Sequence, residues 1–157
     1  MNKLNSVLEI CKEYLSVVDI DFTTTKEIRK NYGLDFHKFE KDFFEWRAVS
    51  LFKKGGPKKG LRLMLVNQDW LSNNKTKLSE IKAVIYHEIG HFLFYSENKA
   101  KREERAEEFA FFLAYMKKEK EVYKVLCEEA ASYKVSPLKE HRKAYEYINT
   151  LKEKYKF

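Results

Sequence analysis

The sequence has no hydrophobic run long enough to cross a membrane. Its longest stretches without a charged side chain are eight residues each, Ile89–Ser96 and Phe109–Met116, whereas a membrane-spanning helix needs about 20 apolar residues. Near the N-terminus, Glu9, Lys12 and Glu13 interrupt the apolar core that a secretion signal requires. We therefore expect a protein without membrane contact, located in the cytoplasm.

Cysteine, proline and glycine are also scarce. Cys11 and Cys127 lie 116 positions apart, so they form neither a metal-binding pair nor a disulfide framework. The sequence contains no repeat, no low-complexity segment and no Pro/Ser-rich linker. Its 157 residues are 44% hydrophobic and 15% aromatic, which is enough for one folded core. We expect a single domain over residues 1–157.

Positive charge is in excess but is not concentrated. The net charge of +7 divides into +3 over residues 1–60 and +4 over residues 61–157, without a basic arm or tail. Five Lys and Arg between residues 53 and 62 surround a Gly-Gly-Pro turn. Such a cluster is typical of a solvated hairpin tip, and a site for an acidic or nucleic-acid partner is the alternative. Direct nucleic-acid binding is therefore kept only as an alternative.

Hydrophobic periodicity predicts an α+β chain that is mostly helical. Helices are expected over residues 4–18, 26–32, 77–94, 102–118 and 121–133, with a final helix beginning at Ser136-Pro137. An aromatic-rich arm at 39–52 and a short strand at 61–67 flank the glycine-rich turn at 55–60. These segments predict a small antiparallel β-hairpin. Residues 68–77 are expected to form a loop.

One motif of five residues carries the chemistry. His87-Glu88-Ile89-Gly90-His91 lies within the predicted helix 77–94, and at 3.6 residues per turn His87 and His91 share one face. Two imidazoles so placed can bind one Zn²⁺. Glu88, about 100° further round the helix, is suited to act as a base toward a metal-activated water. Random placement of this chain's His and Glu would give the pattern in roughly 1% of sequences, so two structural histidines are the weaker explanation.

A catalytic zinc site needs a third protein ligand and one position open for water. The next predicted helix offers Glu103, Glu104, Glu107 and Glu108. Glu103 and Glu107 share a stripe with Ala106 and Ala110, whose small side chains would let the two helices approach closely. Gly90 would permit the same approach from the other helix. We favour Glu103 as the third ligand and Glu107 as a carboxylate that orients a histidine, with the reverse assignment left open.

These residues resemble those of the ImmA/IrrE-type metallopeptidases. The sequence His87-Glu88-Ile89-Gly90-His91, followed by Glu103-x-x-Ala106-Glu107-x-Phe109-Ala110, is similar to that family's H-E-[IL]-G-H and E-x-x-A-[ND]-x-F-A patterns. Weaker similarity covers roughly residues 60–140, and the segment from about 119 to 157 resembles a helix-turn-helix. Glu107 stands where the family has Asn or Asp.

The resemblance implies a zincin-like fold of the gluzincin type and a cytoplasmic zinc endopeptidase with Zn²⁺ on His87, His91 and Glu103. Members typically cleave a transcriptional repressor of a phage or mobile element, so a regulatory protein is the expected substrate and partner. One alternative is a DNA-binding regulator whose recognition helix starts at Pro137–Lys143. Another is a proteolytically inert zinc-binding module, against which Glu88 argues because a structural zinc site needs no base.

Substrate handling is less clearly marked in the sequence. The strand at 61–66 is expected to offer its edge to an extended substrate. The group that stabilises the oxyanion is typically a Tyr or His, and ten tyrosines do not single one out. His141 is a candidate, but a surface or core role is favoured for it, and His37 is interpreted as structural or exposed.

Overall fold

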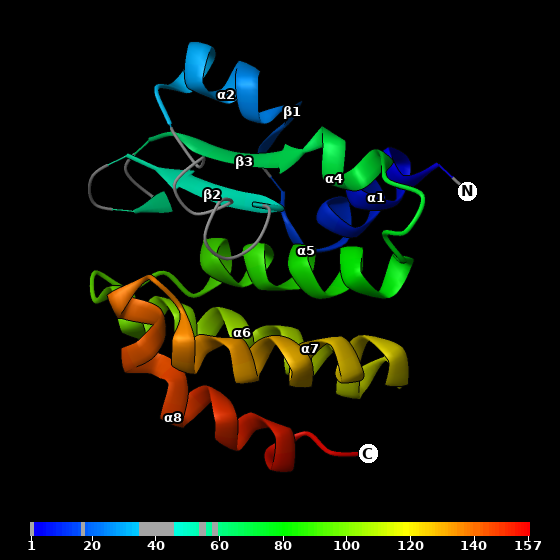
Figure 1. The fold of residues 1–157 in the computed structure, drawn as a ribbon, viewed down its shortest axis with the longest axis vertical. Coiled ribbons are helices and arrows are strands. Elements are labelled where there is room, and N and C mark those ends of the chain that lie inside the picture. Colours follow the sequence, from blue (N-terminus) through cyan, green and yellow to red (C-terminus); the bar gives the residue numbers. More distant parts are fainter. Residues whose placement is uncertain (1, 17, 35–45, 54–55, 58–59) are drawn as a thin grey trace.

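A small β-sheet lies between the helix α2 and a larger group of helices (Figure 1). The protein is represented by a computed structural model that describes residues 2–16, 18–34, 46–53, 56–57 and 60–157. The strands are β1 (Asp19–Thr23), β2 (Ala48–Phe52) and β3 (Arg62–Asn67). The helices are α1 (Lys3–Tyr14), α2 (Thr25–Tyr32), α4 (Gln68–Ser72), α5 (Leu78–Leu93), α6 (Lys99–Met116), α7 (Lys120–Ser132), the 3₁₀ helix η2 (Tyr133–Val135) and α8 (Lys139–Lys154). The predicted α+β class is confirmed.

The sheet is mixed, with the strand order β1-β3-β2. β2 and β3 pair antiparallel, as the predicted hairpin requires, whereas β1 pairs parallel to β3. β1 is not predicted, because its partner is distant in the sequence and a parallel pair has no local turn signal. β3 is therefore the central strand. The expectation that it offers an edge to a substrate is wrong, because β2, the other arm of the predicted hairpin, lies at the edge of the sheet.

Alternation along the strands divides the sheet between two hydrophobic clusters. Met64 and Val66 of β3 belong to the larger cluster, which includes residues of α1 and α5. Leu63 and Leu65 face the other side, where they pack with Ile28 of α2. β3 is thus buried on both faces, which accounts for its unbroken apolar sequence.

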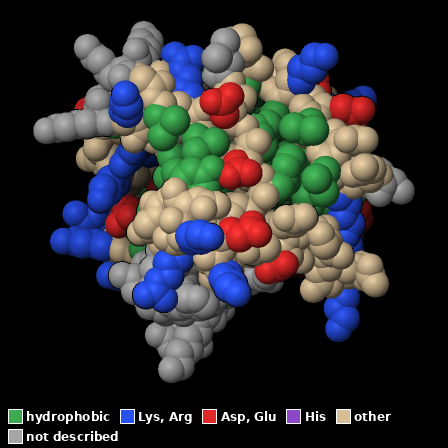
Figure 2. Space-filling view, turned by 90° about the horizontal axis from the view of Figure 1, so that it is seen from above, with side chains coloured by type: hydrophobic (Ala, Val, Ile, Leu, Met, Phe, Trp, Pro, Cys, Tyr) green, Lys and Arg blue, Asp and Glu red, His purple; other side chains and the backbone are tan. Residues whose placement is uncertain are grey.

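The face on the α2 side of the molecule does not contain the motif. Figure 2 shows apolar side chains near the middle of this face, with Lys and Arg side chains mainly around its edge. Among the described residues, no histidine is visible there. α5, which bears the motif, covers the opposite side of the sheet (Figure 1).

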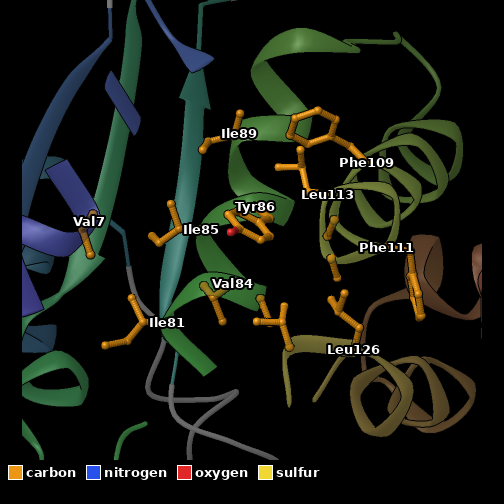
Figure 3. Close-up of a cluster of buried hydrophobic side chains, with 14 of the residues drawn as sticks. Val7, Ile81, Val84, Ile85, Tyr86, Ile89, Phe109, Phe111, Leu113 and Leu126 are labelled. Carbon is orange, nitrogen blue, oxygen red and sulfur yellow. The ribbon is translucent and has the colours of Figure 1, made fainter. Parts of the chain in front are cut away.

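α5 forms the centre of the larger cluster. Ile81 and Ile85 point toward Val7 of α1 and the sheet, whereas Tyr86 points toward Leu113 of α6 (Figure 3). All five of these side chains are at most 5% exposed, and burial of one large apolar side chain stabilises the fold by about 1.5–3 kcal/mol. The helix that bears the motif is therefore held rigidly on two sides.

α5 and α6 approach each other closely at one point. A Cβ atom on Gly90 would lie only 2.7 Å from Cα of Ala106, well inside the optimal carbon–carbon separation. Ala106 and Ala110 are fully buried. The predicted close approach through Gly90 and these alanines is therefore confirmed. It brings Glu103, one turn before Ala106, toward the histidine face of α5.

Several predicted boundaries differ from the structure. α8 begins at Lys139, with Leu138 as its N-cap, because Ser136 Oγ accepts a hydrogen bond from the Leu138 N–H and closes a turn instead. α4 occupies the start of the predicted loop 68–77, since the Asn67 side chain caps it. Residues 39–45 of the aromatic arm, and His37, lie outside the described residues. Within the described part of the chain, no helix combines the length and the apolar character needed to cross a membrane.

Candidate metal centre

His87 and His91 lie one turn apart on α5 and face a common point. Their Nε2 atoms are 3.0 Å apart. The side chains are 13% and 12% exposed, so both rings are mostly shielded from solvent yet reachable from it. This arrangement follows from the i, i+4 spacing of the motif on a regular helix.

Glu103 adds a carboxylate to the two imidazole nitrogens. Its Oε2 lies 3.3 Å from Nε2 of His87, and its Oε1 lies 3.4 Å from Nε2 of His91. With bonds of about 2.0–2.1 Å and tetrahedral angles, zinc ligand atoms lie about 3.3–3.4 Å from each other. Each carboxylate oxygen of Glu103 therefore lies about one zinc ligand–ligand distance from one of the two histidine nitrogens.

Glu88 offers an alternative donor on the same helix. His87, Glu88 and His91 each have a potential ligand atom, and these atoms all lie within 4.8 Å of one another. The Glu88 Oε2 atom, however, accepts a hydrogen bond of 2.6 Å from Ser50 Oγ of β2. Ser50 also contacts the Glu88 carbonyl oxygen at 3.2 Å. Glu103 thus contacts both histidines, while Glu88 is held by the sheet, which favours Glu103 as the ligand.

Glu107 contacts the other side of the His87 ring. Its Oε2 lies 2.6 Å from Nδ1 of His87 and accepts a hydrogen bond of 3.2 Å from the Tyr133 hydroxyl. With a proton on Nδ1, His87 would donate a hydrogen bond to Glu107, and the Nε2 lone pair would be free for a metal ion. Glu107 is 1% exposed, and its Oε1 has no hydrogen-bond partner among the described residues. Its geometry is that of a carboxylate that orients a ligand.

The electrostatics of the site favour a cation. Burial disfavours a charged imidazole, but Glu103 and Glu107 outweigh burial and hold the pKa of His87 well above its usual value. For Glu103, burial opposes ionisation, yet His91 and His87 outweigh it and hold the pKa of its carboxyl well below the usual range. Two carboxylates that stabilise a positive charge at this point would also stabilise a divalent metal ion.

Two aromatic side chains from the C-terminal segment reach the same place. Tyr133 donates to Glu103 Oε2 at 3.3 Å, and the His141 ring lies against the Tyr133 ring with centroids 4.8 Å apart. The His141 Nε2 atom is 3.6 Å from Glu103 Oε2, and its Nδ1 is 3.0 Å from Ser136 Oγ. Burial lowers the pKa of His141, although Glu103 opposes this. The neutral ring can therefore donate from one nitrogen and accept at the other.

The structure places His141 beside the motif, within 3.6 Å of Glu103. His141 borders the motif rather than standing apart from it, because α8 folds back over α6. Tyr133 and Ser50 are two further residues that the sequence did not indicate as part of the site. None of the three is near the motif in the sequence, so no local spacing could have marked them.

The motif opens into a groove of about 730 Å³. Its walls come from β2, α5, α6, α7 and the turn before α8, and they include His87, Glu88, His91 and Glu103. At its Trp46 end an ion pair between Arg47 and Glu129 joins the walls. A volume of this order lies within the range of ligand-binding pockets.

Searches against protein-family models, curated proteins and solved structures found no match for this chain. The ImmA/IrrE-type resemblance therefore stays a prediction from the motif residues. The functional argument depends on the geometry of the site itself, and above all on the three side chains His87, His91 and Glu103.

Proposed function

We propose that the protein is a zincin-like, zinc-dependent endopeptidase. The observation that supports this most strongly is that the two histidine Nε2 atoms lie 3.0 Å apart and that each has a Glu103 carboxylate oxygen at 3.3 or 3.4 Å, distances near those between the ligands of tetrahedral zinc. Glu107 would orient His87 through Nδ1. When bound, zinc would lower the pKa of a water molecule toward neutrality and polarise the carbonyl of the peptide bond.

Glu88 is the general base in this proposal. Ser50 binds its Oε2, and the other carboxylate oxygen has no hydrogen-bond partner in the described part of the chain. That oxygen would take the proton of the attacking water and later deliver it to the leaving amine. The Ser50 contact fixes the carboxylate plane, so the base is aimed before the substrate arrives.

His141 is the better of two candidates for the oxyanion donor. The Tyr133 hydroxyl is already engaged by Glu103 and Glu107. His141 keeps its Nε2 at the groove, 3.6 Å from Glu103, while Nδ1 faces Ser136. A hydrogen on Nε2 would stabilise negative charge on the carbonyl oxygen as water attacks.

The substrate would bind as an extended segment along β2. β2 is the strand of the sheet that borders the groove, and its outer edge is unpaired among the described residues. An added peptide strand would form hydrogen bonds with the unpaired backbone groups of that edge. It would run past Ser50 and Glu88. A cytoplasmic regulatory protein, such as a repressor of a phage or mobile element, fits this mode if it exposes a flexible segment.

The two other functions are less well supported by the geometry. In a DNA-binding protein the first residues of the recognition helix face the major groove. Here Pro137, Leu138 and His141 line the groove beside the motif instead. An inert zinc module would not need Glu88 to be held by Ser50 at the mouth of an open groove.

The test combines metal content with proteolysis. The zinc-loaded protein is expected to cleave an unfolded protein substrate or a co-expressed repressor, and Glu88→Gln is expected to keep its zinc and lose cleavage. The matched control is Glu104→Gln, because Glu104 is a neighbouring glutamate on α6 that pairs with Lys101. This variant should keep both its zinc and its cleavage activity. Normal zinc content without cleavage by any form would instead support the inert module.

A further inference from the structure

The groove has two distinct ends, with the proposed base between them. The Ser50 hydroxyl contacts Glu88, and the Phe52 ring packs against Phe92 with centroids 5.0 Å apart, so β2 and α5 run in the same direction. α7 follows this direction too (Figure 1) and leads to Tyr133 beside the motif. We call the two ends the Ala48 end and the Phe52 end after the terminal residues of β2.

The Ala48 end is negatively charged. Its lining includes Glu80, Glu128 and Glu129, against which Arg47 is the single cation among the described lining residues at this end. Arg47 forms an ion pair with Glu129. Glu128 is exposed and makes no hydrogen bond or ion pair with the described residues, so its charge is available to a ligand.

The Phe52 end is positively charged. Lys99 and Arg102 line it, together with one carboxylate, Glu140. The Arg102 guanidinium lies 5.2 Å above the centre of the Tyr95 ring. Neither cation has an ion-pair partner in the described part of the chain. Lys53 follows Phe52 directly, so the adjoining hairpin adds positive charge on the same side.

We infer that the groove selects an extended segment with acidic residues before the cleaved bond and basic residues after it. This inference rests on the proposed endopeptidase function. Antiparallel pairing is the more stable way to add a strand to β2. It places the amino-terminal part of the substrate at the Phe52 end, near Lys99 and Arg102. The carboxyl-terminal part then lies at the Ala48 end, near Glu128.

The length of β2 sets where those charges meet the substrate. Ser50, beside the base, is two residues from Ala48 and two from Phe52. An extended chain rises by about 3.3 Å per residue, so each end lies about 7 Å from the bond to be cleaved. The selected side chains are thus two or three residues away on either side.

The test uses two fluorogenic peptides of identical composition, Glu-Glu-Leu-Phe-Lys-Lys and its charge-reversed counterpart Lys-Lys-Leu-Phe-Glu-Glu. The zinc-loaded full chain is expected to cleave the first with a kcat/KM about fivefold to tenfold higher, because each exposed charge pair contributes modestly. The ratio should shrink as salt rises. Equal rates, or a preference for the second peptide, would overturn the inference while leaving the endopeptidase function standing.

Charge-reversal variants connect the preference to the two ends. Glu128→Lys and Lys99→Glu should each lower the ratio severalfold. The matched controls are Glu121→Lys on α7 and Lys101→Glu on α6, exposed residues outside the groove lining, which should keep the wild-type ratio. If the zinc-loaded protein cleaves neither peptide nor an unfolded protein, the proposed function fails and the inference fails with it.

Discussion

The Oε2 atom of Glu107 lies 2.6 Å from Nδ1 of His87, across the imidazole ring from the Nε2 atom that faces His91 and Glu103. The buried Glu107 carboxylate therefore holds the orientation of the His87 ring through Nδ1. The other ring nitrogen, Nε2, faces the point that His91 and Glu103 also face. This relationship supports the assignment of the two glutamates that the sequence favours over its reverse. Glu103 is placed to bind a metal ion and Glu107 to orient its ligand.

Weakening the contact between Glu107 and His87 should weaken metal binding. Glu107→Gln keeps the shape of the side chain but removes the negative charge that favours a proton on Nδ1. We expect zinc affinity to fall by about 10–100-fold, measured by competition with a chromogenic chelator, while circular dichroism confirms folding. Glu104→Gln serves as the control, and an unchanged affinity of Glu107→Gln would argue against an orienting role.

Gly90→Ala should destabilise the protein, although alanine favours helix by about 1 kcal/mol. The added methyl group would meet the backbone of Ala106 at 2.7 Å. We expect the forced separation of α5 and α6 to lower the free energy of unfolding by about 1–3 kcal/mol. The melting temperature of the metal-free protein should then fall by several degrees. A higher melting temperature would show that helix propensity outweighs the close contact.

Loss of the Ser50 hydroxyl should affect catalysis more than binding. In Ser50→Ala the Glu88 carboxylate loses the hydrogen bond that fixes its orientation. We expect zinc content and KM to stay near wild type and kcat to fall about tenfold. Ser72→Ala, at an exposed position on α4, is the control. A fall in zinc content instead would place Glu88 among the ligands.

Glu129 should make stability depend on pH. Burial raises the pKa of its carboxyl to about 7, although Arg47 opposes the shift. Between about pH 4.5 and 7 the folded protein keeps a proton that the unfolded chain has released, so this group lowers the free energy of unfolding as pH rises. In urea titrations of the metal-free protein, the free energy of unfolding of Glu129→Gln should fall less between about pH 4.5 and 7 than that of the wild type. The difference should be on the order of 1–3 kcal/mol.

Glu121→Gln is the control for the pH series, because Glu121 is exposed on the same helix and pairs only with Lys124 among the described residues. Its stability should follow the wild-type pH dependence. Parallel curves for wild type and Glu129→Gln would mean that the buried carboxyl is ionised throughout this range.

The parts of the site that depend on local spacing could be predicted from the sequence. His87 and His91 share a helix face by the period of the helix alone, and the small side chains of Gly90 and Ala106 indicate a close helix pair. Tyr133, His141 and Ser50 could not be predicted, because each reaches the motif through the folding of a distant element. The parallel strand β1 could not be predicted for the same reason.

Zinc stoichiometry tests the central claim most directly. Elemental analysis of purified protein should find one zinc per chain in the wild type and in Glu104→Ala. Glu103→Ala should lose it, because the Glu103 carboxylate contacts both histidines, Oε2 facing His87 Nε2 and Oε1 facing His91 Nε2. If Glu103→Ala keeps one tightly bound zinc per chain, or if the wild type binds none, the proposed metal centre is wrong.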